Sequence, residues 1–314
     1  MHTSPQIVEK DFWVVWTLKK LYEMDFSDHL FFRGGTSLSK VYEIIHRFSE
    51  DIDLAINRKY FGFNDQKLIS CSTISQQERL LSKLNKQNKT HLKNSVLPQL
   101  QNTFSKLLPS GKWNLKFEQD ERLYWLTFSY PPSLSENTSL YAYIRPEVKI
   151  ELYANQDNEP WHKKNIIPYI ANYFKDEINL MCPAKVVSMT RTFYEKVALI
   201  HSAIERNSIS ADRFSRHLYD IYCISKSDEF NSIINNKNLF FNIIKSRKIF
   251  YRQPAANYDK ILQNTLNLDP KDNLLNKIKH DYIKMEEMIY GPIPSIDKIL
   301  KTAKNIQNRL NYTE

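Results

Sequence analysis

Cysteine is scarce in this sequence, and the spacing of the few cysteines excludes two kinds of site. The 314 residues contain three cysteines, Cys71, Cys182 and Cys223. Their number is odd and they lie far apart, which fits neither a disulfide framework nor the ligand spacing of a zinc site. We therefore expect free thiols in a reducing environment, as in the cytoplasm.

Long apolar segments are missing as well. No apolar run approaches the roughly 20 residues that a membrane-spanning helix needs. The N-terminus, MHTSPQIVEKDF, lacks the basic start and apolar stretch of a secretory signal, and the sequence has no internal repeat and no coiled-coil heptads. With 42% hydrophobic and 25% charged residues, the composition is typical of a globular protein, which we expect to be cytoplasmic.

Negative charge is in deficit. The chain has 44 Lys and Arg against 35 Asp and Glu, a net charge of +9. Such an excess favours an anionic partner, with nucleic acid as the first candidate. Charge alone also fits a basic protein without such a partner. The length is sufficient for one large domain or for two ordinary ones.

One stretch, FFRGGTSLSK followed shortly by FSEDIDL, is the most informative part of the sequence. The apolar run Leu30-Phe31-Phe32 predicts a short buried strand, which Gly34-Gly35 interrupts. From Thr36 onward, apolar residues recur at helical spacing, so we expect a helix that ends near Arg47-Phe48. Backbone N–H groups at a helix N-terminus that follows glycines form a place for phosphate oxygens.

A pair of carboxylates follows on a second predicted strand that begins at Asp51. Side chains alternate along a strand, so Asp51 and Asp53 face one side while Ile52 points toward the core. Two carboxylates beside a phosphate site suit Mg²⁺ that bridges protein and triphosphate. Each half of the pattern alone is commonly an ordinary turn or a surface strand. Together, in this order and across one helix, the two halves are far more specific.

The remaining pattern predicts a mixed α/β domain followed by helices. We expect an amphipathic helix from Pro5 to Met24, a helical insertion around residues 66–108, a hairpin over 113–119 and 122–130, and a strand over 141–153. A polar segment at Asp157-Asn158-Glu159-Pro160 indicates a linker. The sequence therefore predicts two domains, residues 1–160 and residues 161–314, the second mostly helical from about Pro183.

Charged residues on three later elements are further candidates. The strand 141–153 carries Glu147 and Glu151 on one face, and either carboxylate could complete a metal site, although a mixed-charge surface gives the same pattern. A predicted helix over 191–201 holds Lys196 away from its apolar face. Another, over 212–222, aligns Arg216 and Asp220 on one stripe. Basic residues grouped in this way clamp triphosphates or RNA backbones, and ordinary charged helix faces look alike.

The motifs together resemble a known family. Gly35-Thr36, a helix and then Asp51-x-Asp53 resemble the signature of DNA polymerase beta-type nucleotidyltransferases. With Glu195-Lys196 on one helix and Arg216-His217-x-x-Asp220 on the next, the order of motifs resembles the AbiEii/AbiGii toxin family of nucleotidyltransferases. The chain departs from that family at Arg216-His217, where a Lys-Asp pair is common.

The resemblance implies an α/β nucleotidyltransferase core with a mixed sheet, and a helical C-terminal domain that closes the active-site cleft. It also implies the toxin of a toxin–antitoxin or phage-defence (abortive infection) pair, with a cognate antitoxin as partner. The activity would be transfer of a nucleoside monophosphate from an NTP to RNA, such as the tRNA 3′ end. Transfer to a protein hydroxyl or to a small molecule such as an antibiotic, and a non-catalytic nucleic-acid-binding module, are the alternatives.

The resemblance also implies roles for individual residues. Asp51, Asp53 and Glu151 would bind Mg²⁺ or Mn²⁺, since the third acid of such enzymes stands on a later strand between two apolar residues; Glu147 is the alternative. Lys196 would act in catalysis by pairing with the triphosphate. The other residues implied in nucleotide binding are Gly34, Gly35, Thr36, Ser37, Lys40, Lys149, Arg216 and Asp220.

Overall fold

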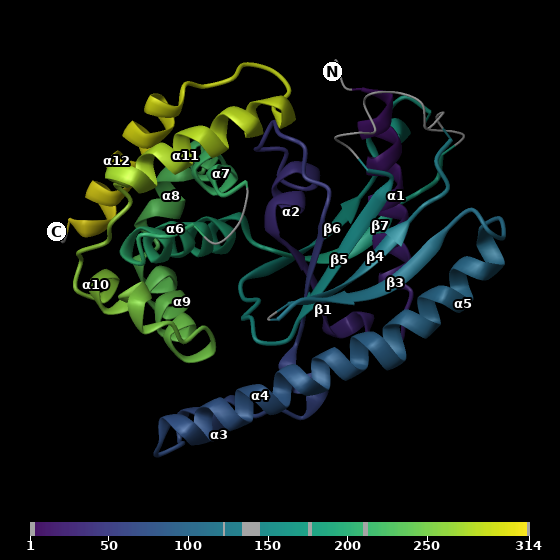
Figure 1. The fold of residues 1–314 in the computed structure, drawn as a ribbon, viewed down its shortest axis with the longest axis horizontal. Coiled ribbons are helices and arrows are strands. Elements are labelled where there is room, and N and C mark those ends of the chain that lie inside the picture. Colours follow the sequence, from purple (N-terminus) through teal and green to yellow (C-terminus); the bar gives the residue numbers. More distant parts are fainter. Residues whose placement is uncertain (1–3, 122, 134–144, 175–177, 210–212, 313–314) are drawn as a thin grey trace. The chain divides into compact units, whose positions relative to one another are not determined.

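The computed structural model describes residues 4–121, 123–133, 145–174, 178–209 and 213–312. It has a mixed α/β fold, as expected, and divides into two compact units (Figure 1). Unit 1 comprises residues 1–41 and 49–187, and unit 2 comprises residues 42–48 and 188–314. The short segment 42–48 therefore belongs by its contacts to the second unit, although it lies early in the chain.

Unit 1 is built on a seven-stranded mixed sheet with the strand order β3-β4-β5-β2-β1-β7-β6. β1 pairs antiparallel with β2 and parallel with β7, while β2 pairs parallel with β5. The strands are β1 (Leu30–Arg33), β2 (Ile52–Ile56), β3 (Asn114–Gln119), β4 (Tyr124–Ser129), β5 (Glu147–Tyr153), β6 (Trp161–Ile166) and β7 (Cys182–Val187).

The main core of unit 1 lies on the sheet face that carries the apolar residues of β5, and a smaller buried cluster of Phe31, Ala55 and Val187 lies on the opposite face. Burial alternates along β5, whose apolar residues are buried and whose charged residues are partly exposed, as expected for a strand with one face on the core. Trp16 of the first helix packs against Phe104 and Phe128 in that core. The helices of unit 1 are α1 (Pro5–Tyr22), α2 (Gly34–Lys40), α3 (Asp65–Ile69), α4 (Ile74–His91) and α5 (Leu97–Leu107). One π-helical turn, Leu92–Val96, joins α4 to α5 in a long helical rod (Figure 1).

Unit 2 is helical. Its early segment is tied in by backbone hydrogen bonds from Phe48 to Met288 O and from Tyr290 to His46 O, at 2.8 and 2.9 Å, with a β-bridge between Arg47 and Ile289. Its helices are α6 (Met189–Glu205), α7 (Ser215–Ile224), α8 (Phe230–Asn235), α9 (Lys237–Phe250), α10 (Tyr258–Leu262), α11 (Asp272–Met285) and α12 (Ile296–Asn311). In the part of the chain that the structure describes, no helix combines the length and apolarity needed to cross a membrane.

Most predicted elements are confirmed, including the first helix, the helical insertion and the hairpin of β3 and β4. Three parts of the prediction lie outside the described residues: residue 122 of the hairpin, residues 141–144 of the strand that continues as β5, and residue 212 of the helix that continues as α7. The observed β5 starts directly after Pro146, as a proline at a strand start requires.

The predicted length of the helix after the glycine pair is wrong. α2 ends at Lys40 instead of near Arg47, and Glu43 has a left-handed backbone with φ of 52°. Ile44 and Ile45, whose spacing suggested a continuing helix, belong to unit 2, in which Ile45 is buried. Their apolar character therefore serves the core of the second unit and carries no information on helical periodicity.

The chain from 161 to 187 also differs from the expectation. It contributes β6 and β7 to the sheet of unit 1, so that the contacts divide the units after Val187, not near residue 160. β6 gives a weak strand signal because residues 162–165 are polar and exposed. An edge strand lacks the buried alternation on which sequence reasoning depends.

Candidate active site

The chain turns sharply where β1 meets α2. Gly34 follows Arg33 with φ of 81°, a left-handed conformation that glycine adopts without steric cost. A Cβ atom at Gly34 would lie 2.0 Å from Oδ2 of Asp53. The turn and the Asp53 carboxylate are therefore in direct contact, and only a residue without a side chain permits this approach.

Two hydroxyl side chains fix the turn from within. Thr36 Oγ1 donates to the carbonyl oxygen of Asp51 at 2.6 Å and lies 2.9 Å from Ser49 Oγ. Ser37 Oγ donates to the carbonyl oxygen of Gly34 at 2.9 Å. Both side chains are buried. In this structure they hold the turn and the segment before β2 in place, and their role in phosphate binding stays a prediction.

The sheet brings two of the predicted carboxylates side by side. Asp53 is paired in register with Arg33 of β1 and with Glu151 of β5. Residues paired across neighbouring strands are about 5 Å apart and share a face. Glu147 lies four positions away along β5, roughly 13 Å at the usual rise per residue. Glu151 is thus the carboxylate that the register places beside Asp53, and Asp51 stands just before β2.

Glu151 is already compensated by the protein itself. Its carboxylate forms an ion pair with Lys149 and accepts a hydrogen bond from the Tyr153 hydroxyl. Lys149 Nζ also lies 4.6 Å from the centre of the Trp125 ring, a cation–π distance. Lys149, a candidate for nucleotide binding, therefore forms an ion pair with the predicted third carboxylate.

The donor set on this face fits a magnesium site that is completed by substrate. Among the described residues, no three His, Cys, Asp or Glu side chains are grouped so as to hold a metal ion. Mg²⁺ in nucleotide-dependent enzymes usually binds one or two carboxylates, several waters and the substrate phosphates. The register that pairs Asp53 with Glu151 places two carboxylate side chains on neighbouring strands, the kind of donor pair that such a site uses.

The last residue of α2 is anchored to α1. Lys40 Nζ forms a 2.7 Å ion pair with Asp11 and lies 3.5 Å from the centre of the Tyr169 ring. Asp11 also accepts the backbone N–H of Tyr169 at 2.6 Å. A second buried lysine, Lys10, belongs to α1 and pairs with Glu50 at 2.5 Å. Lys40, which the sequence suggested for nucleotide binding, here fixes α2 to the body of unit 1.

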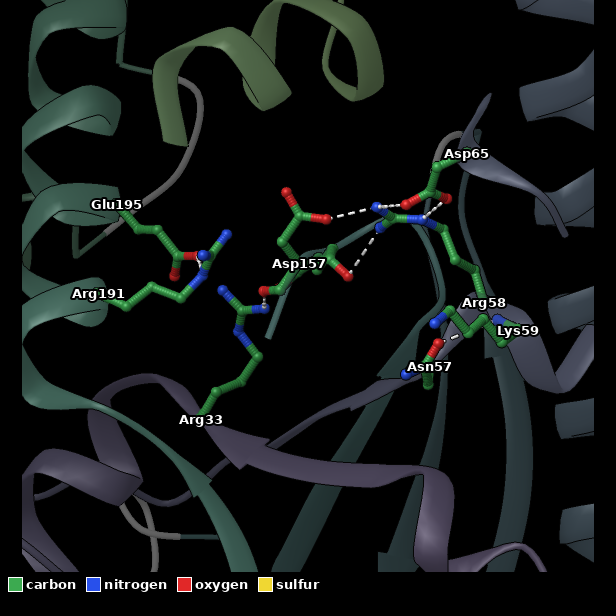
Figure 2. A network of polar contacts seen from close by, with 9 residues as sticks. Arg33, Asn57, Arg58, Lys59, Asp65, Asp157, Arg191 and Glu195 are labelled. Atoms are coloured by element: carbon green, nitrogen blue, oxygen red, sulfur yellow. Dashed lines mark hydrogen bonds and ion pairs between the residues drawn. The ribbon is translucent and has the colours of Figure 1, made fainter. Parts of the chain in front are cut away.

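An arginine network ties down the loop after β5. Arg58 donates to both carboxylate oxygens of Asp65, at 2.5 and 2.7 Å, and to Asp157 at 2.5 Å. Arg33 donates to the backbone carbonyl of Asp157 at 3.4 Å. Figure 2 shows Asp157 with the side chains of Arg33 and Arg58 on either side. No local pattern in the sequence predicts the contacts of Asp157, which lies 99 positions from Arg58 and 124 positions from Arg33.

Unit 2 has its own buried charge cluster, on α6, α7 and the early segment. The fully buried Asp220 carboxylate accepts two bonds from Arg47, at 2.7 and 2.8 Å, and pairs with Lys196 at 2.8 Å. Burial alone would raise the pKa of Asp220, but Arg47 and Lys196 hold that pKa well below its usual value. Sequence reasoning found Lys196 and Asp220 and missed Arg47, which lies far away in the chain.

Further positive charge surrounds this cluster. Burial lowers the pKa of His217 well below its usual value, and the charges of Lys196 and Arg216 act in the same direction. His217 Nδ1 is buried and has no hydrogen-bond partner among the described residues. On α6, Arg191 pairs with Glu195 at 3.0 Å (Figure 2). Arg47, Lys196 and Arg216 all lie close enough to His217 to lower its pKa, and basic groups of this kind can bind an anion.

Comparisons with known proteins identify a family and a fold. Residues 16–302 match the family described as nucleotidyl transferase AbiEii toxin, type IV toxin–antitoxin system. Among solved structures, the chain is similar to MenT4, a nucleotidyltransferase toxin from Mycobacterium tuberculosis H37Rv, with 14% sequence identity and a TM-score of 0.52 over 99% of this chain and 87% of that one. At this identity the likeness shows the fold alone, and it confirms the predicted fold class. No curated protein sequence matches the chain.

Proposed function

Because the chain belongs to the AbiEii family of nucleotidyltransferase toxins of type IV toxin–antitoxin systems, we propose that it transfers a nucleoside monophosphate from an NTP to RNA. The tRNA 3′ end is the favoured acceptor, a cognate antitoxin protein the favoured partner, and defence against phage by abortive infection the favoured role. The observation that carries the proposal is the register of Asp53 with Glu151, directly beside the Gly34 turn.

Each of these features has a use in nucleotidyl transfer. The acceptor hydroxyl oxygen forms a bond to the α-phosphorus, the bond from that phosphorus to the bridging oxygen breaks, and pyrophosphate leaves. Asp51, Asp53 and Glu151 would hold Mg²⁺ or Mn²⁺, which when bound offsets the negative charge on the leaving pyrophosphate. As an alternative to binding the metal, Glu151 would take the proton of the attacking hydroxyl. The backbone at Gly34 and Gly35 would leave room for phosphates.

The basic cluster of unit 2 supplies the other candidates. Lys196 and Arg216 would pair with the triphosphate. Asp220 is fully buried and already engaged with Arg47 and Lys196. It is therefore better suited to orient Lys196 than to contact a nucleotide itself. Two lysines of unit 1 are also candidates for nucleotide binding. Lys149 forms an ion pair with Glu151, and Lys40 forms one with Asp11.

The net charge of +9 supports RNA as the acceptor. Transfer to a protein hydroxyl or to a small molecule would use the same chemistry, and binding without transfer is the remaining alternative. The decisive experiment incubates the full chain with each α-labelled NTP, Mg²⁺ and total RNA, and then separates the RNA, protein and small-molecule fractions. Label in RNA supports the proposal, label in another fraction reassigns the acceptor, and no label with any NTP contradicts the proposed activity.

The same incubation with Asp53→Asn is the control for chemistry at the proposed site. This substitution keeps the shape of the side chain and removes its charge. Label that persists in the variant at the wild-type rate would show that the transfer does not depend on the site described here.

A further inference from the structure

A strongly basic edge lies on unit 1 away from the carboxylates. β6 is the last strand in the sheet order, and its residues 162–165 are all exposed. Lys163 is paired in register with Lys185 of β7, and Lys164 with Ala184. Three lysines thus stand on two adjacent strands at the rim of the sheet.

These lysines line a cavity of about 440 Å³, together with residues from the end of α1 and the turn before β1. One carboxylate, Asp28, is part of the lining, and Lys185 donates to the Asp28 carbonyl and lies 3.5 Å from its carboxylate. Among the residues that the structure describes, neither Lys163 nor Lys164 is paired with a carboxylate. The cavity therefore carries an excess of positive charge, which suits phosphate groups.

An aromatic side chain, Trp161, lies next to one of these lysines, Lys185. The Nε1 group of Trp161, at the start of β6, donates to Glu159 at 2.8 Å, which fixes the orientation of the indole. The ring meets Phe31 edge-on, with centroids 5.7 Å apart, and Lys185 Nζ lies 5.5 Å from its centre. Aromatic rings beside cations are the usual combination for binding single-stranded nucleic acid, because bases stack on the ring while phosphates meet the charges.

The sheet register relates this edge to the candidate active site. Trp161 is paired with Val187, Phe32 with Val186, and Arg33 with Asp53. Trp161 and Asp53 therefore stand in one row across the four strands β6, β7, β1 and β2. Phe31, Ala55 and Val187 form one cluster against which Trp161 packs, which shows that the row shares a face. Three strand spacings separate its ends, about 14 Å.

We propose that the β6 edge, meaning Trp161, Lys163, Lys164 and Lys185, binds the phosphate backbone of the acceptor RNA a few nucleotides from its reacting end. This inference rests on the proposed function. Lysines on an edge strand also discourage edge-to-edge pairing. That protective role needs exposed charge alone and requires neither the cavity nor the fixed indole.

The test compares two double variants with the same change in net charge. Lys163→Glu/Lys164→Glu alters the β6 edge, and Lys83→Glu/Lys86→Glu alters two exposed lysines of α4 in the same unit. Fluorescence anisotropy with fluorescein-labelled total tRNA measures affinity as a function of salt. We expect the β6 variant to bind about tenfold more weakly and to show a salt slope reduced by about 1.4 to 1.8, the loss of two phosphate contacts. The α4 variant should stay close to wild type.

Further variants separate charge and stacking from damage to the fold. Lys163→Gln/Lys164→Gln removes the charges without reversing them and should give a smaller loss of affinity in the same direction. Trp161→Ala should weaken tRNA binding, whereas Trp161→Phe, which keeps a ring, should retain most of it. Thermal unfolding of each variant shows whether the sheet is intact.

The outcomes for the edge and for the chemistry are distinct. Equal tRNA affinity in the β6 and α4 variants, or no binding of tRNA by the wild type, overturns the inference about the β6 edge. If the wild type nevertheless transfers label from an NTP, the proposed function still stands. Loss of tRNA affinity in the β6 variant supports the inference even if no NTP yields transfer, a result that contradicts the proposed function alone. In an active protein, the β6 variant should raise KM for tRNA without changing kcat.

Discussion

At the scale of single residues, the contact between Gly34 and Asp53 is the tightest constraint on the proposed site. The space that a Cβ would need is occupied by the Asp53 carboxylate. Glycine is therefore needed at position 34 for two reasons: a side chain would clash with Asp53, and the positive φ angle favours glycine. Gly62 separates these two requirements, because it has φ of 66° and no atom within 4 Å of an ideal Cβ.

Gly34→Ala should therefore abolish nucleotidyl transfer, since the added methyl displaces Asp53, while Gly62→Ala should retain it. Each variant should lose about 1 kcal/mol of stability from the left-handed backbone. Gly34→Ala should lose more, because its methyl also displaces Asp53, and denaturant unfolding measures both losses. Equal transfer by the two alanine variants would show that the carboxylate position beside the turn is unimportant.

The two glutamates of β5 give a second comparison. Glu151→Gln should lower kcat by orders of magnitude with little change in NTP affinity, the pattern of a group that acts in the transition state. Glu147→Gln, roughly 13 Å further along the strand, should be mild. Steady-state kinetics on both variants check this expectation, and a dead Glu147→Gln beside a normal Glu151→Gln would assign the third carboxylate the other way.

Sequence reasoning located these carboxylates because strand alternation and apolar neighbours are local properties. The same reasoning could not foresee the partners of Thr36 and Lys40. Thr36 is held by Ser49 and by the backbone of Asp51, and Lys40 by Asp11. Such partners are brought in by the fold, and a hydroxyl or ammonium group looks alike in the sequence whether it binds a ligand or a neighbour.

At the scale of elements, α6 and α7 are joined through Asp220, which serves two cations. Removing one member of a buried ion pair costs about 3 to 5 kcal/mol, because the other charge stays buried without compensation. The consequences differ among the three residues of this cluster. Loss of Asp220 leaves Arg47 and Lys196 unpaired, whereas loss of Lys196 leaves the two bonds between Arg47 and Asp220 in place.

Asp220→Ala should therefore destabilise the protein more than Lys196→Met does, with a loss of several kcal/mol for the first variant. Lys196→Met should fold, and under the proposed role it should weaken NTP binding and turnover together. Urea unfolding and NTP titration measure the two effects. An equal loss of stability in the Asp220 and Lys196 variants would contradict the view that Asp220 compensates two buried cations. Unchanged NTP binding by Lys196→Met would show that Lys196 is not part of the nucleotide site.

His201 makes the stability of the helical unit depend on pH. Its Nδ1 accepts the backbone N–H of Asn267 at 3.0 Å, and Nε2 lies 3.3 Å from the carbonyl oxygen of Asn257. This geometry requires a neutral ring. Burial lowers the pKa of His201 below its usual value near 6.5. As the pH falls below about 6.5, His201 takes up a proton in the unfolded chain before it does so in the folded protein. The contribution of His201 to the free energy of unfolding is therefore complete above that pH and is lost as the pH falls below it.

We expect the free energy of unfolding to fall between pH 7 and pH 5 by up to about 1.4 kcal/mol per pH unit from this residue. His201→Gln should reduce that slope, although it lowers stability at neutral pH. His280→Gln, at an exposed position on α11, should leave the slope unchanged. Unfolding curves at a series of pH values test the prediction, which a slope independent of position 201 would refute.

Element length and pairing were harder to foresee than element type. The sequence predicted β1, the glycine turn and β2 correctly because they are short and strongly patterned. The predicted helix α2 was too long because apolar residues that follow it, Ile45 and Phe48 among them, are buried in unit 2. Sequence reasoning missed β6 because a polar edge strand has no buried face to leave a period of two in the sequence.

At the scale of the whole molecule, neither unit is a continuous stretch of chain. Unit 2 borrows residues 42–48 from the N-terminal part, and these residues deliver Arg47 to Asp220. A fragment of residues 188–314 should therefore be markedly less stable than unit 2 within the full chain, since it buries Asp220 with Lys196 alone. Circular dichroism of the fragment, with and without residues 42–48 fused through a flexible linker, tests this point; equal stability of the two would contradict it.

The borrowed segment also sets the timing of assembly during protein synthesis. Arg47 leaves the ribosome 173 residues before its partner. At typical elongation rates of 5 to 20 residues per second, the arginine remains without Asp220 for about 9 to 35 s. The ion pair between Lys196 and Asp220 also forms only after residue 220 has been synthesised. A ribosome that stalls before residue 220 would therefore carry a chain that lacks this cluster.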